Sequence, residues 1–395
     1  MPDGMDELGG EARDAQLKAA GLAAVREVKP LVFNANNAVT ALVERLALND
    51  GTDVVRKVLV ADGPTPVAHW AAGDSPRHWN YWRREVHAYL SGRLPTGSDG
   101  TTTIVSGPAG TADGLRAPEL LAQVTPAKGV EVLFLEHVDG RSGPELTELD
   151  LAAIATGLGC WQGARAGSFN GTDPAAFPAW WSRDWMWDYA ESRPPGAAGY
   201  ADDAAWSHPL VVQGFGSRFE RIRAGFGALY EELPRWRTVA ALLPAAPAHL
   251  DCWANNAIVA EGRSPVLFDW SFCGVAHLGA DAGNLVPDGL LDHYGDADSY
   301  GSLNRTVTAA YLDGLAQAGW DGPLDAVRLG ICLAPAKFAW LPALMAANAS
   351  WSGPTGYGGQ QGLVHLEVFR RRAVVFEAML DSVDEARRLA HSLGL

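Results

Sequence analysis

The sequence predicts a two-lobed α+β fold, with a small β-rich N-lobe that carries one helix and a larger, mostly helical C-lobe. The chain has 395 residues, which is long for a single domain and enough to bury a sizeable core. Hydrophobic residues make up 48% and charged residues 19%, as in globular proteins and unlike disordered or coiled-coil chains. Strand-like runs come before about residue 145, and amphipathic segments follow it. We divide the chain into an N-terminal lead-in (1–28), an N-lobe (29–138) and a C-lobe (139–395).

The N-terminal part alternates between turn signals and strand-like runs. The acidic lead-in passes into a short helix, and residues 31–48 then alternate in the manner of two strands. The turn Asn49-Asp50-Gly51 precedes VVRKVLV, a β-branched run of strand length. An amphipathic helix is predicted over 78–94, ended by glycine and proline. Two further strands are predicted at TTTIVSG (101–107) and VEVLFLEHV (130–138).

The C-terminal part is predicted to be helical after a hinge near 137–143. A long amphipathic helix with an acidic first turn follows the hinge, at 145–164. One strand-like island, AIVAEGRSPVLFDW (257–270), interrupts the helical region. The remaining predicted helices lie at 217–233, 303–317, 325–348 and 364–393.

Composition excludes several classes of function. Lys and Arg number 31 against 46 Asp and Glu, and the net charge of −15 argues against nucleic-acid binding and favours cationic or neutral ligands. The four cysteines form no paired motif, so a cytoplasmic location is expected. The acidic start lacks the apolar core of a signal peptide. The most apolar stretch, 326–347, is interrupted by Arg328, Pro335 and Lys337, which favours a buried helix over a membrane span.

The strongest chemical signal is the stretch His249-Leu-Asp251-Cys-Trp-Ala-Asn-Asn256, thirteen residues ahead of Asp269. Phosphoryl transfer from a nucleotide needs a carboxylate that orients the acceptor hydroxyl, oxygen ligands for Mg²⁺, and a cation on the phosphates. Mg²⁺ prefers carboxylate and amide oxygens. A turn that presents Asp251 and Asn256, followed by a hairpin that returns Asp269, would bring three such groups together.

This stretch resembles the catalytic loop of the aminoglycoside phosphotransferase-like small-molecule kinases, a family with the protein-kinase-like fold. The usual stretch there is His-Gly-Asp-x-x-x-x-Asn, and this chain has leucine at 250 in place of glycine. The resemblance covers roughly residues 30–350. It implies that Asp251 is the catalytic base and that Asn256 and Asp269 bind Mg²⁺. In the family His249 orients the loop rather than reacting, and Asp281 braces it.

The resemblance also assigns residues of the N-lobe. Lys57, in VVRKVLV, would hold the nucleotide phosphates, although a solvated strand lysine and the neighbouring Arg56 are alternatives. Glu85 would form the ion pair with Lys57, or would be a surface charge. Backbone groups of Glu136 to Val138 would meet the purine edge. In place of a glycine-rich loop over the phosphates the chain has Asn34-Ala35-Asn36-Asn37-Ala38, and Asn36 and Asn37 are the candidates for that task.

Candidates for the acceptor site are less specific. The segment AWWSRDWMWDY concentrates tryptophans that would either form an aromatic wall or fill a core, and core packing is the more common outcome. The acceptor candidates are Asp184, Trp185, Asp288 and Asp292, with His293 beside the last.

These observations predict an enzyme that transfers the γ-phosphate of ATP or GTP, with Mg²⁺, to a hydroxyl of a small molecule. The bias toward Arg and Ala resembles high-GC bacteria, which favours an antibiotic or related natural product, of aminoglycoside or nucleoside type, and hence antibiotic resistance. A sugar or amino-sugar kinase of primary metabolism and a nucleotide-binding pseudokinase are the alternatives. A hydrolase using Cys252 and His249 is a third. A monomer or homodimer, with no nucleic-acid or membrane partner, is expected.

Overall fold

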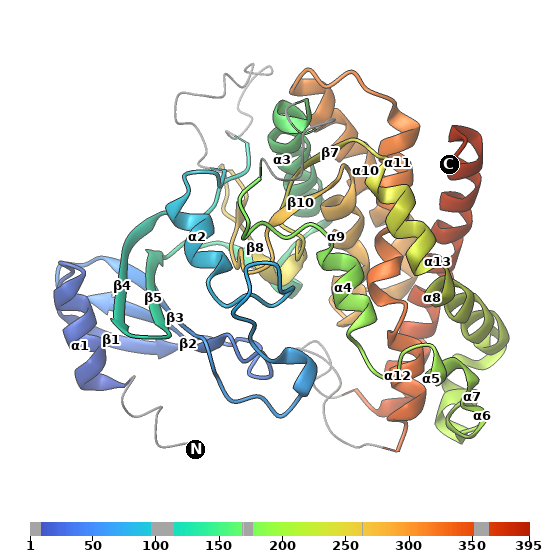
Figure 1. Cartoon of the computed structure of the whole chain (residues 1–395), viewed down its shortest axis with the longest axis horizontal. Helices are drawn as coiled ribbons and strands as arrows, with labels where there is room; N and C mark the ends of the chain where they lie inside the picture. The colour runs from blue at the N-terminus through green and yellow to red at the C-terminus, as the bar shows by residue number, and fades with distance from the viewer. Residues whose placement is uncertain (1–8, 96–113, 168, 170–176, 263, 351–362) are drawn as a thin grey trace.

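A five-stranded antiparallel sheet, in the order β1-β2-β3-β5-β4, forms the N-lobe. The computed structural model describes residues 9–95, 114–167, 169, 177–262, 264–350 and 363–395. In Figure 1 the sheet lies on the left, in blue to teal, and the helical C-lobe fills the right. The N-lobe elements are α1 (Gly10–Ala19), β1 (Val25–Pro30), β2 (Thr40–Leu48), β3 (Asp53–Val60), α2 (Arg84–Leu90), β4 (Leu120–Ala127) and β5 (Val130–Glu136).

Strand β3 is the centre of the sheet and is covered on both faces. Because side chains alternate along a strand, Val54 and Val58 pack on one face, in a cluster that includes Leu17 of α1. Leu59 packs on the other face, in a cluster that includes Val86 of α2. The same alternation separates Arg56 from its neighbour Lys57, which shares the α2 side with Leu59.

The strands differ from the prediction at the start of the sheet and at β4. The first strand is β1, which begins at Val25, and residues 31–39 form a loop rather than a strand. Strand β4 was not predicted, since LLAQVTPA contains a proline and polar residues that weaken a strand pattern. The predicted strand at 101–107 lies outside the described residues. Helix α2 covers only the middle of the helix predicted over 78–94.

The C-lobe is mostly helical, as predicted, and holds two small sheets that carry the loops between the lobes. Strand β7 pairs with β10, and β8 lies between β6 and β9. The long helices α3 and α10 pack closely because glycines allow it: a Cβ on Gly314 would lie 2.2 Å from the Thr156 carbonyl oxygen. The elements are β6 (Arg141–Ser142), α3 (Glu148–Ala166), α4 (Trp185–Glu191), α5 (Ala198–Ala201), α6 (Asp203–Trp206), α7 (Pro209–Phe215), α8 (Phe219–Ala241), β7 (Ala245–Ala248), β8 (Ala257–Val259), β9 (Val266–Leu267), β10 (Gly274–His277), α9 (Ala280–Leu291), α10 (Tyr300–Gln317), α11 (Leu324–Cys332), α12 (Leu341–Ala347) and α13 (His365–Leu393).

The apolar segment near residue 335 forms three short helices rather than one long one. Helix α11 ends at Cys332, the 3₁₀ helix η8 spans Ala334–Phe338, and α12 begins at Leu341. Pro335 and Pro342 stand at the starts of the second and third pieces, where a missing N–H is tolerated. Over Leu324–Ala347 the chain is apolar and long enough to cross a membrane, yet 83% of its most apolar window is buried inside the protein.

Candidate active site

A cleft of about 550 Å³ lies between the two lobes. Strands β3 and β5 and the loop 31–39 line it from the N-lobe, and the loops after β7 and β9 line it from the C-lobe. One end is lined by Lys57, Glu85, Asp269 and the segment from Leu135 to Gly140. We call the other end the acceptor half, and its lining residues are Trp185, Tyr189, Asp251, Asp288 and Lys337.

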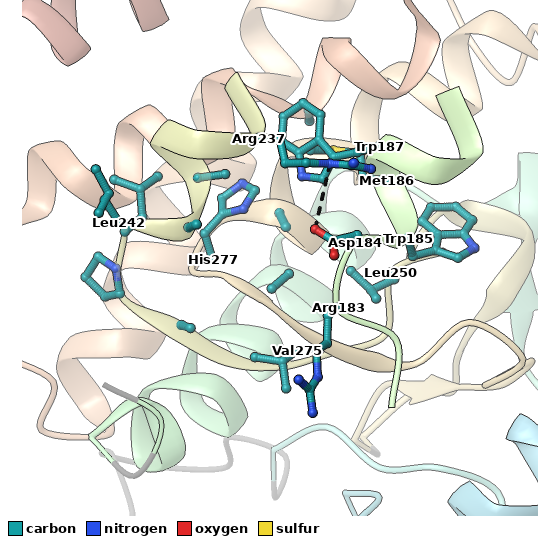
Figure 2. A pocket seen from close by; sticks show the side chains of 18 of the residues that line it. Arg183, Asp184, Trp185, Met186, Trp187, Arg237, Leu242, Leu250, Val275 and His277 are labelled. Carbon is teal, nitrogen blue, oxygen red and sulfur yellow. Dashed lines mark ion pairs between the residues drawn. The ribbon is translucent and has the colours of Figure 1, made fainter. Parts of the chain in front are cut away.

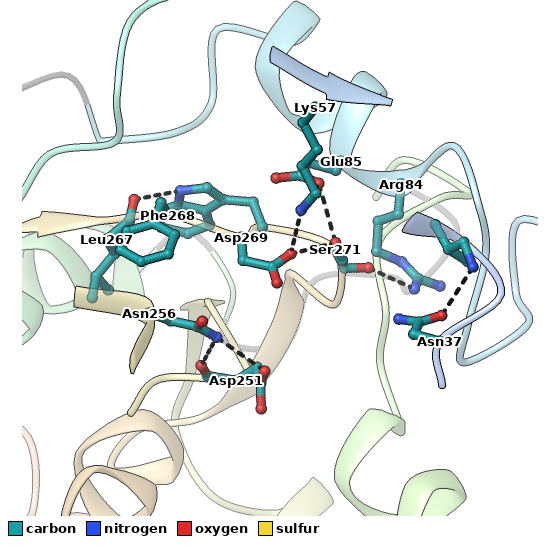
Figure 3. A network of polar contacts seen from close by, with 12 residues as sticks. Asn37, Lys57, Arg84, Glu85, Asp251, Asn256, Leu267, Phe268, Asp269 and Ser271 are labelled. Carbon is teal, nitrogen blue, oxygen red and sulfur yellow. Dashed lines mark hydrogen bonds and ion pairs between the residues drawn. The ribbon is translucent and has the colours of Figure 1, made fainter. Parts of the chain in front are cut away.

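Lys57 is brought into contact with two carboxylates from distant segments. Its Nζ lies 2.6 Å from Glu85 Oε2, on α2, and 2.7 Å from Asp269 Oδ1, after β9. The Ser271 hydroxyl donates to Asp269 Oδ1 at 2.6 Å, and Figure 3 shows these side chains converging. Arg56, the alternative to Lys57, lies on the opposite face, where it pairs with Glu44 at 2.6 Å. Lys57, Glu85 and Asp269 therefore form one network at the cleft.

The electrostatics of this network keep Lys57 charged. Burial acts to lower the pKa of Lys57, but the carboxylates of Asp269 and Glu85 outweigh it, and the pKa is raised. Burial raises the pKa of Glu85, partly offset by Lys57. For Asp269 the effect of burial is outweighed by Lys57, and its pKa is lowered. A fixed ammonium thus stands in the cleft at neutral pH.

Asp251 and Asn256 lie opposite this network on the turn that follows β7. Asn256 Nδ2 donates to the Asp251 backbone carbonyl at 2.9 Å and to Asp251 Oδ2 at 3.0 Å (Figure 3). The Lys337 ammonium donates to the other carboxylate oxygen, Oδ1, at 3.1 Å. Burial raises the pKa of Asp251 to about 6, against the opposing effect of Lys337. The carboxylate is therefore fixed at both oxygens.

Two residues of the site have left-handed backbone conformations. Leu250 has φ +70° and Asp269 has φ +61°. Such conformations cost about 1–3 kcal/mol for residues other than glycine and are typical of functional sites. The value at Leu250 gives a physical reason why glycine suits this position of the motif.

The loop that carries Asp251 is held from behind by Asp281 of α9. Asp281 accepts from the backbone N–H groups of His249, at 2.8 Å, and Leu250, at 2.7 Å. Gln162 of α3 donates to Asp281 at 2.9 Å and in turn accepts from the Tyr311 hydroxyl at 2.5 Å. These contacts place Asp281 in a bracing position.

His249 is also engaged with backbone groups. Its Nδ1 accepts from the Asp251 N–H at 3.3 Å, and its Nε2 lies 2.9 Å from the Phe268 carbonyl oxygen, to which it donates in this tautomer. Cys252 is fully buried, and burial raises the pKa of its thiol well above the usual range. Neither residue is arranged as a nucleophile or base, so a hydrolase gains no support.

The donor set at the cleft fits a hard metal ion. The amide of Asn256 uses its Nδ2 on Asp251, which leaves Oδ1 as a ligand, and Asp269 has Oδ2 outside its contacts with Lys57 and Ser271. In the described part of the chain no three His, Cys, Asp or Glu residues are grouped as metal ligands. One carboxylate and one amide oxygen suit an ion such as Mg²⁺ that takes its remaining ligands from phosphates and water.

The segment predicted to meet a purine lies at the end of β5. The Glu136 N–H donates to the Glu119 carbonyl at 2.9 Å, and the Glu136 carboxylate pairs with Arg116 at 2.5 Å. Val138 lines the cleft, and its N–H makes no backbone hydrogen bond to another described residue. Val138 is therefore the better placed of the two for a base edge.

The asparagine loop is ordered by its own side chains. The Asn34 side chain accepts from the Asn36 N–H at 3.1 Å, and the Asn37 side chain accepts from the Val39 N–H at 3.1 Å. Asn80 donates to the same Asn37 oxygen at 3.0 Å. Asn34 and Asn37 line the cleft, whereas Asn36 is exposed and outside its lining.

Lys337 is a charged residue of the cleft that sequence reasoning did not identify as part of the site. It is 4% exposed on η8, and its Nζ lies 2.7 Å from Asp288 Oδ2 and 3.1 Å from Asp251 Oδ1. Burial acts to lower its pKa, but Asp288 and Asp251 outweigh this and raise it. The available signal was a single lysine inside an otherwise apolar stretch, since a buried lysine needs partners.

The residues predicted for the acceptor site do not all lie in one place in the structure. Trp185 and Asp288 line the cleft, while Asp292 is buried and lines neither this cleft nor the cavity described next. A second cavity of about 800 Å³ shares Trp185 and Lys337 with the cleft, and it is there that Asp184 lies, 3.8 Å from Arg237 (Figure 2). The other tryptophans of this segment are mainly core residues, with Trp181 and Trp187 buried.

Comparisons with known proteins show that this chain is similar to several solved structures. No family model and no curated protein matches the chain. The amicoumacin kinase hAmiN, in complex with AMP-PNP, Ca²⁺ and Ami, is 14% identical, with a TM-score of 0.49 over 95% of this chain and 96% of that one. A choline/ethanolamine kinase family protein from Mesorhizobium loti is 17% identical, with a TM-score of 0.49 over 96% and 97%. The aminoglycoside phosphotransferase APH(3'')-Id from Streptomyces rimosus, in complex with ADP and streptomycin, is 17% identical, with a TM-score of 0.44 over 85% and 99%.

These likenesses concern the course of the chain, and the ligands named with them belong to those proteins. The evidence of the chain itself is the order of its elements and the contacts at its cleft. A five-stranded sheet with α2 precedes a helical lobe, and Lys57, Glu85 and Asp269 converge opposite the loop of Asp251. On this evidence the chain has the protein-kinase-like, two-lobed fold of the aminoglycoside phosphotransferase-like small-molecule kinases.

Proposed function

We propose that this protein transfers the γ-phosphoryl group of ATP or GTP, with Mg²⁺, to a hydroxyl of a small molecule, most simply an antibiotic or related natural product. The observation that carries the proposal is the contact of Lys57 Nζ with both Glu85 and Asp269 in a cleft that also holds Asp251 and Asn256. Five polar residues from four separate segments converge there. Packing of a hydrophobic core does not need such a group of polar side chains, so a functional role is the better explanation.

In this proposal each residue has one task. Lys57, held by Glu85, neutralises the phosphates, and Asn256 and Asp269 hold Mg²⁺, which when bound offsets the charge of the phosphate oxygens. The acceptor oxygen forms a bond to the γ-phosphorus as the bond from that phosphorus to the bridging oxygen breaks. The hydroxyl proton passes to Asp251, and the nucleoside diphosphate leaves. Most of the rate enhancement then comes from positioning and fixed charge.

The proposal is tested first without an acceptor. Thermal unfolding is measured with Mg–ATP and Mg–GTP for the wild type, for Asp269→Ala and for Asp313→Ala, a control at an exposed position of α10. Nucleotide at 100 times its Kd should stabilise the wild type and the control by about 2.7 kcal/mol. The stabilisation should depend on Mg²⁺ and be lost in Asp269→Ala. A folded wild type that no nucleotide stabilises would contradict the proposal.

Turnover separates a kinase from a nucleotide-binding pseudokinase. The wild type is expected to release ADP slowly with water as acceptor and faster with compounds from an antibiotic and sugar panel. Asp251→Asn should abolish both activities while keeping the nucleotide-dependent thermal shift, because Asp251 is outside the contacts of Lys57. Nucleotide binding with no Asp251-dependent turnover would favour the pseudokinase.

A further inference from the structure

The acceptor half of the cleft holds one ammonium between two carboxylates, and this arrangement bears on the class of acceptor. Resting on the proposed phosphotransfer, we propose that this site accepts hydroxyl compounds that are neutral or acidic and rejects those with an amine near the reacting hydroxyl. Lys337 is the residue that makes the selection.

The first argument is the state of the two carboxylates. Among the described residues that line the acceptor half, the acidic ones are Asp251 and Asp288, and both are bound to Lys337 Nζ, at 3.1 and 2.7 Å. The second oxygen of Asp251 is taken by Asn256 at 3.0 Å. An ammonium on the acceptor would have to displace Lys337 or lie beside it as a like charge. The overall charge of −15 is therefore no guide to the charge that an acceptor meets here.

The second argument is the use of the aromatic rings. Rings attract cations over their faces, and cationic ligands are often bound this way. Lys337 Nζ already lies 5.1 Å from the centre of the Trp185 ring. Two cations of the chain lie near the Tyr189 ring, Lys337 Nζ at 5.8 Å and the Arg193 guanidinium at 3.8 Å from its centre, and Arg193 also lies 4.3 Å from the centre of the Trp70 ring. The chain's own cations thus already lie against the rings of Trp70, Trp185 and Tyr189, where a cationic acceptor would meet a like charge.

The third argument is that Lys337 is held firmly. It lies on η8, one turn before α12, and its backbone carbonyl accepts from Trp340 Nε1 at 2.8 Å. Its side chain is 5% exposed and the rings beside it limit its movement. A buried cation with two carboxylate partners keeps its charge and its place, so an acidic group on the acceptor would find a fixed partner for a charge-assisted hydrogen bond.

Three probes of similar size and different charge test this inference. They are para-(hydroxymethyl)benzoate, para-(hydroxymethyl)benzamide and para-(hydroxymethyl)benzylamine, each with one ring and one primary hydroxyl. Binding is measured by calorimetry and ligand-observed NMR in the presence of Mg–AMP-PNP, with the wild type, Lys337→Met and Lys337→Arg. If Lys337→Met does not fold, the double variant Lys337→Met/Asp288→Asn is used in its place. In the double variant the carboxylate of Asp288, which would have lost its ion-pair partner, is also removed.

In the wild type the amine should bind at least about tenfold more weakly than the carboxylate, with the amide between them. Lys337→Met should shift the ratio of the two dissociation constants by about tenfold or more toward the amine, and Lys337→Arg should keep the wild-type order. A wild type that prefers the amine, or a ratio unchanged in Lys337→Met, would overturn the inference. So would the failure of all three probes to bind at millimolar concentration.

The thermal shift with Mg–ATP, measured on the same samples, keeps this test separate from the proposed function. If nucleotide binding is present and the charge preference is absent, only the acceptor class is wrong. If nucleotide binding is itself absent, the failure lies with the proposed phosphotransfer.

Discussion

Arg84, beside Glu85 on α2, offers a sharp test of how the cleft is held together. Its guanidinium is fully buried. It donates to backbone carbonyls of the loop before α2 and to two backbone carbonyls of the C-lobe. The bonds to the carbonyls of His78, Trp79 and Trp180 are 2.6, 2.8 and 2.9 Å long. Two longer bonds reach the carbonyls of Ser271, at 3.2 Å, and Pro76, at 3.4 Å.

The magnitude of the change Arg84→Met follows from the bonds that it removes. Three short bonds from a charged donor contribute about 2 kcal/mol each, net of the cost of taking the groups out of water. Burial lowers the pKa of Arg84 to about 10, yet the guanidinium stays charged at neutral pH. The variant is therefore expected to lose about 6 kcal/mol in the free energy of unfolding. Because Glu85 follows directly, Mg–ATP binding should weaken as well.

Urea unfolding followed by circular dichroism measures this loss, with Arg77→Met as the matched control. Arg77 is exposed in the same loop, so its change should stay within about 0.5 kcal/mol. If Arg84→Met unfolds within about 0.5 kcal/mol of the wild type, or if Arg77→Met costs as much, the carbonyl contacts do not hold α2 and the reasoning fails.

Three further changes test other parts of the structure. Glu85→Gln removes one of the two carboxylates on Lys57, so Mg–ATP binding measured by calorimetry should weaken at least about tenfold, and an unchanged affinity would refute the pairing. His277 is buried and its pKa is lowered to about 4, so between pH 6.5 and pH 4 only the unfolded chain takes up a proton on this residue. The free energy of unfolding should therefore decrease by about 2 kcal/mol between pH 8 and pH 5 because of His277. In His277→Gln this part of the decrease should be absent when urea unfolding is compared at the two pH values. A Cβ at Gly274 would lie 1.9 Å from the Ser182 carbonyl oxygen, so Gly274→Ala should cost about 1–3 kcal/mol, seen as a lower Tm, and an unchanged Tm would show that the contact is loose.

The sequence was most informative where chemistry and local pattern coincide. The motif from His249 to Asn256, with Asp269 after it, identified a turn and a returning strand, and these lie together in the cleft. Lys57 could be separated from Arg56 only in the structure, because a strand pattern alone does not say which face meets the other lobe.

Other features depend on contacts between distant segments, which periodicity does not report. Strand β4 forms because β5 offers it an edge, although LLAQVTPA is a weak strand on its own. Lys337 lies 86 residues from Asp251 in the chain, so nothing local marks it as a partner. In the sequence it appeared as an interruption of an apolar stretch.

The bracing of the loop that carries Asp251 has a consequence for how this protein can diversify. That loop is held by Asp281 of α9, which is in turn bonded through Gln162 of α3 to Tyr311 of α10. None of these three side chains lines the cleft. Two residues of the acceptor half, Trp185 and Tyr189, come instead from α4. Under the proposed phosphotransfer, substitutions on α4 would change which molecule is accepted while the braces of the loop stay in place, so that new specificities would not need to pass through inactive intermediates.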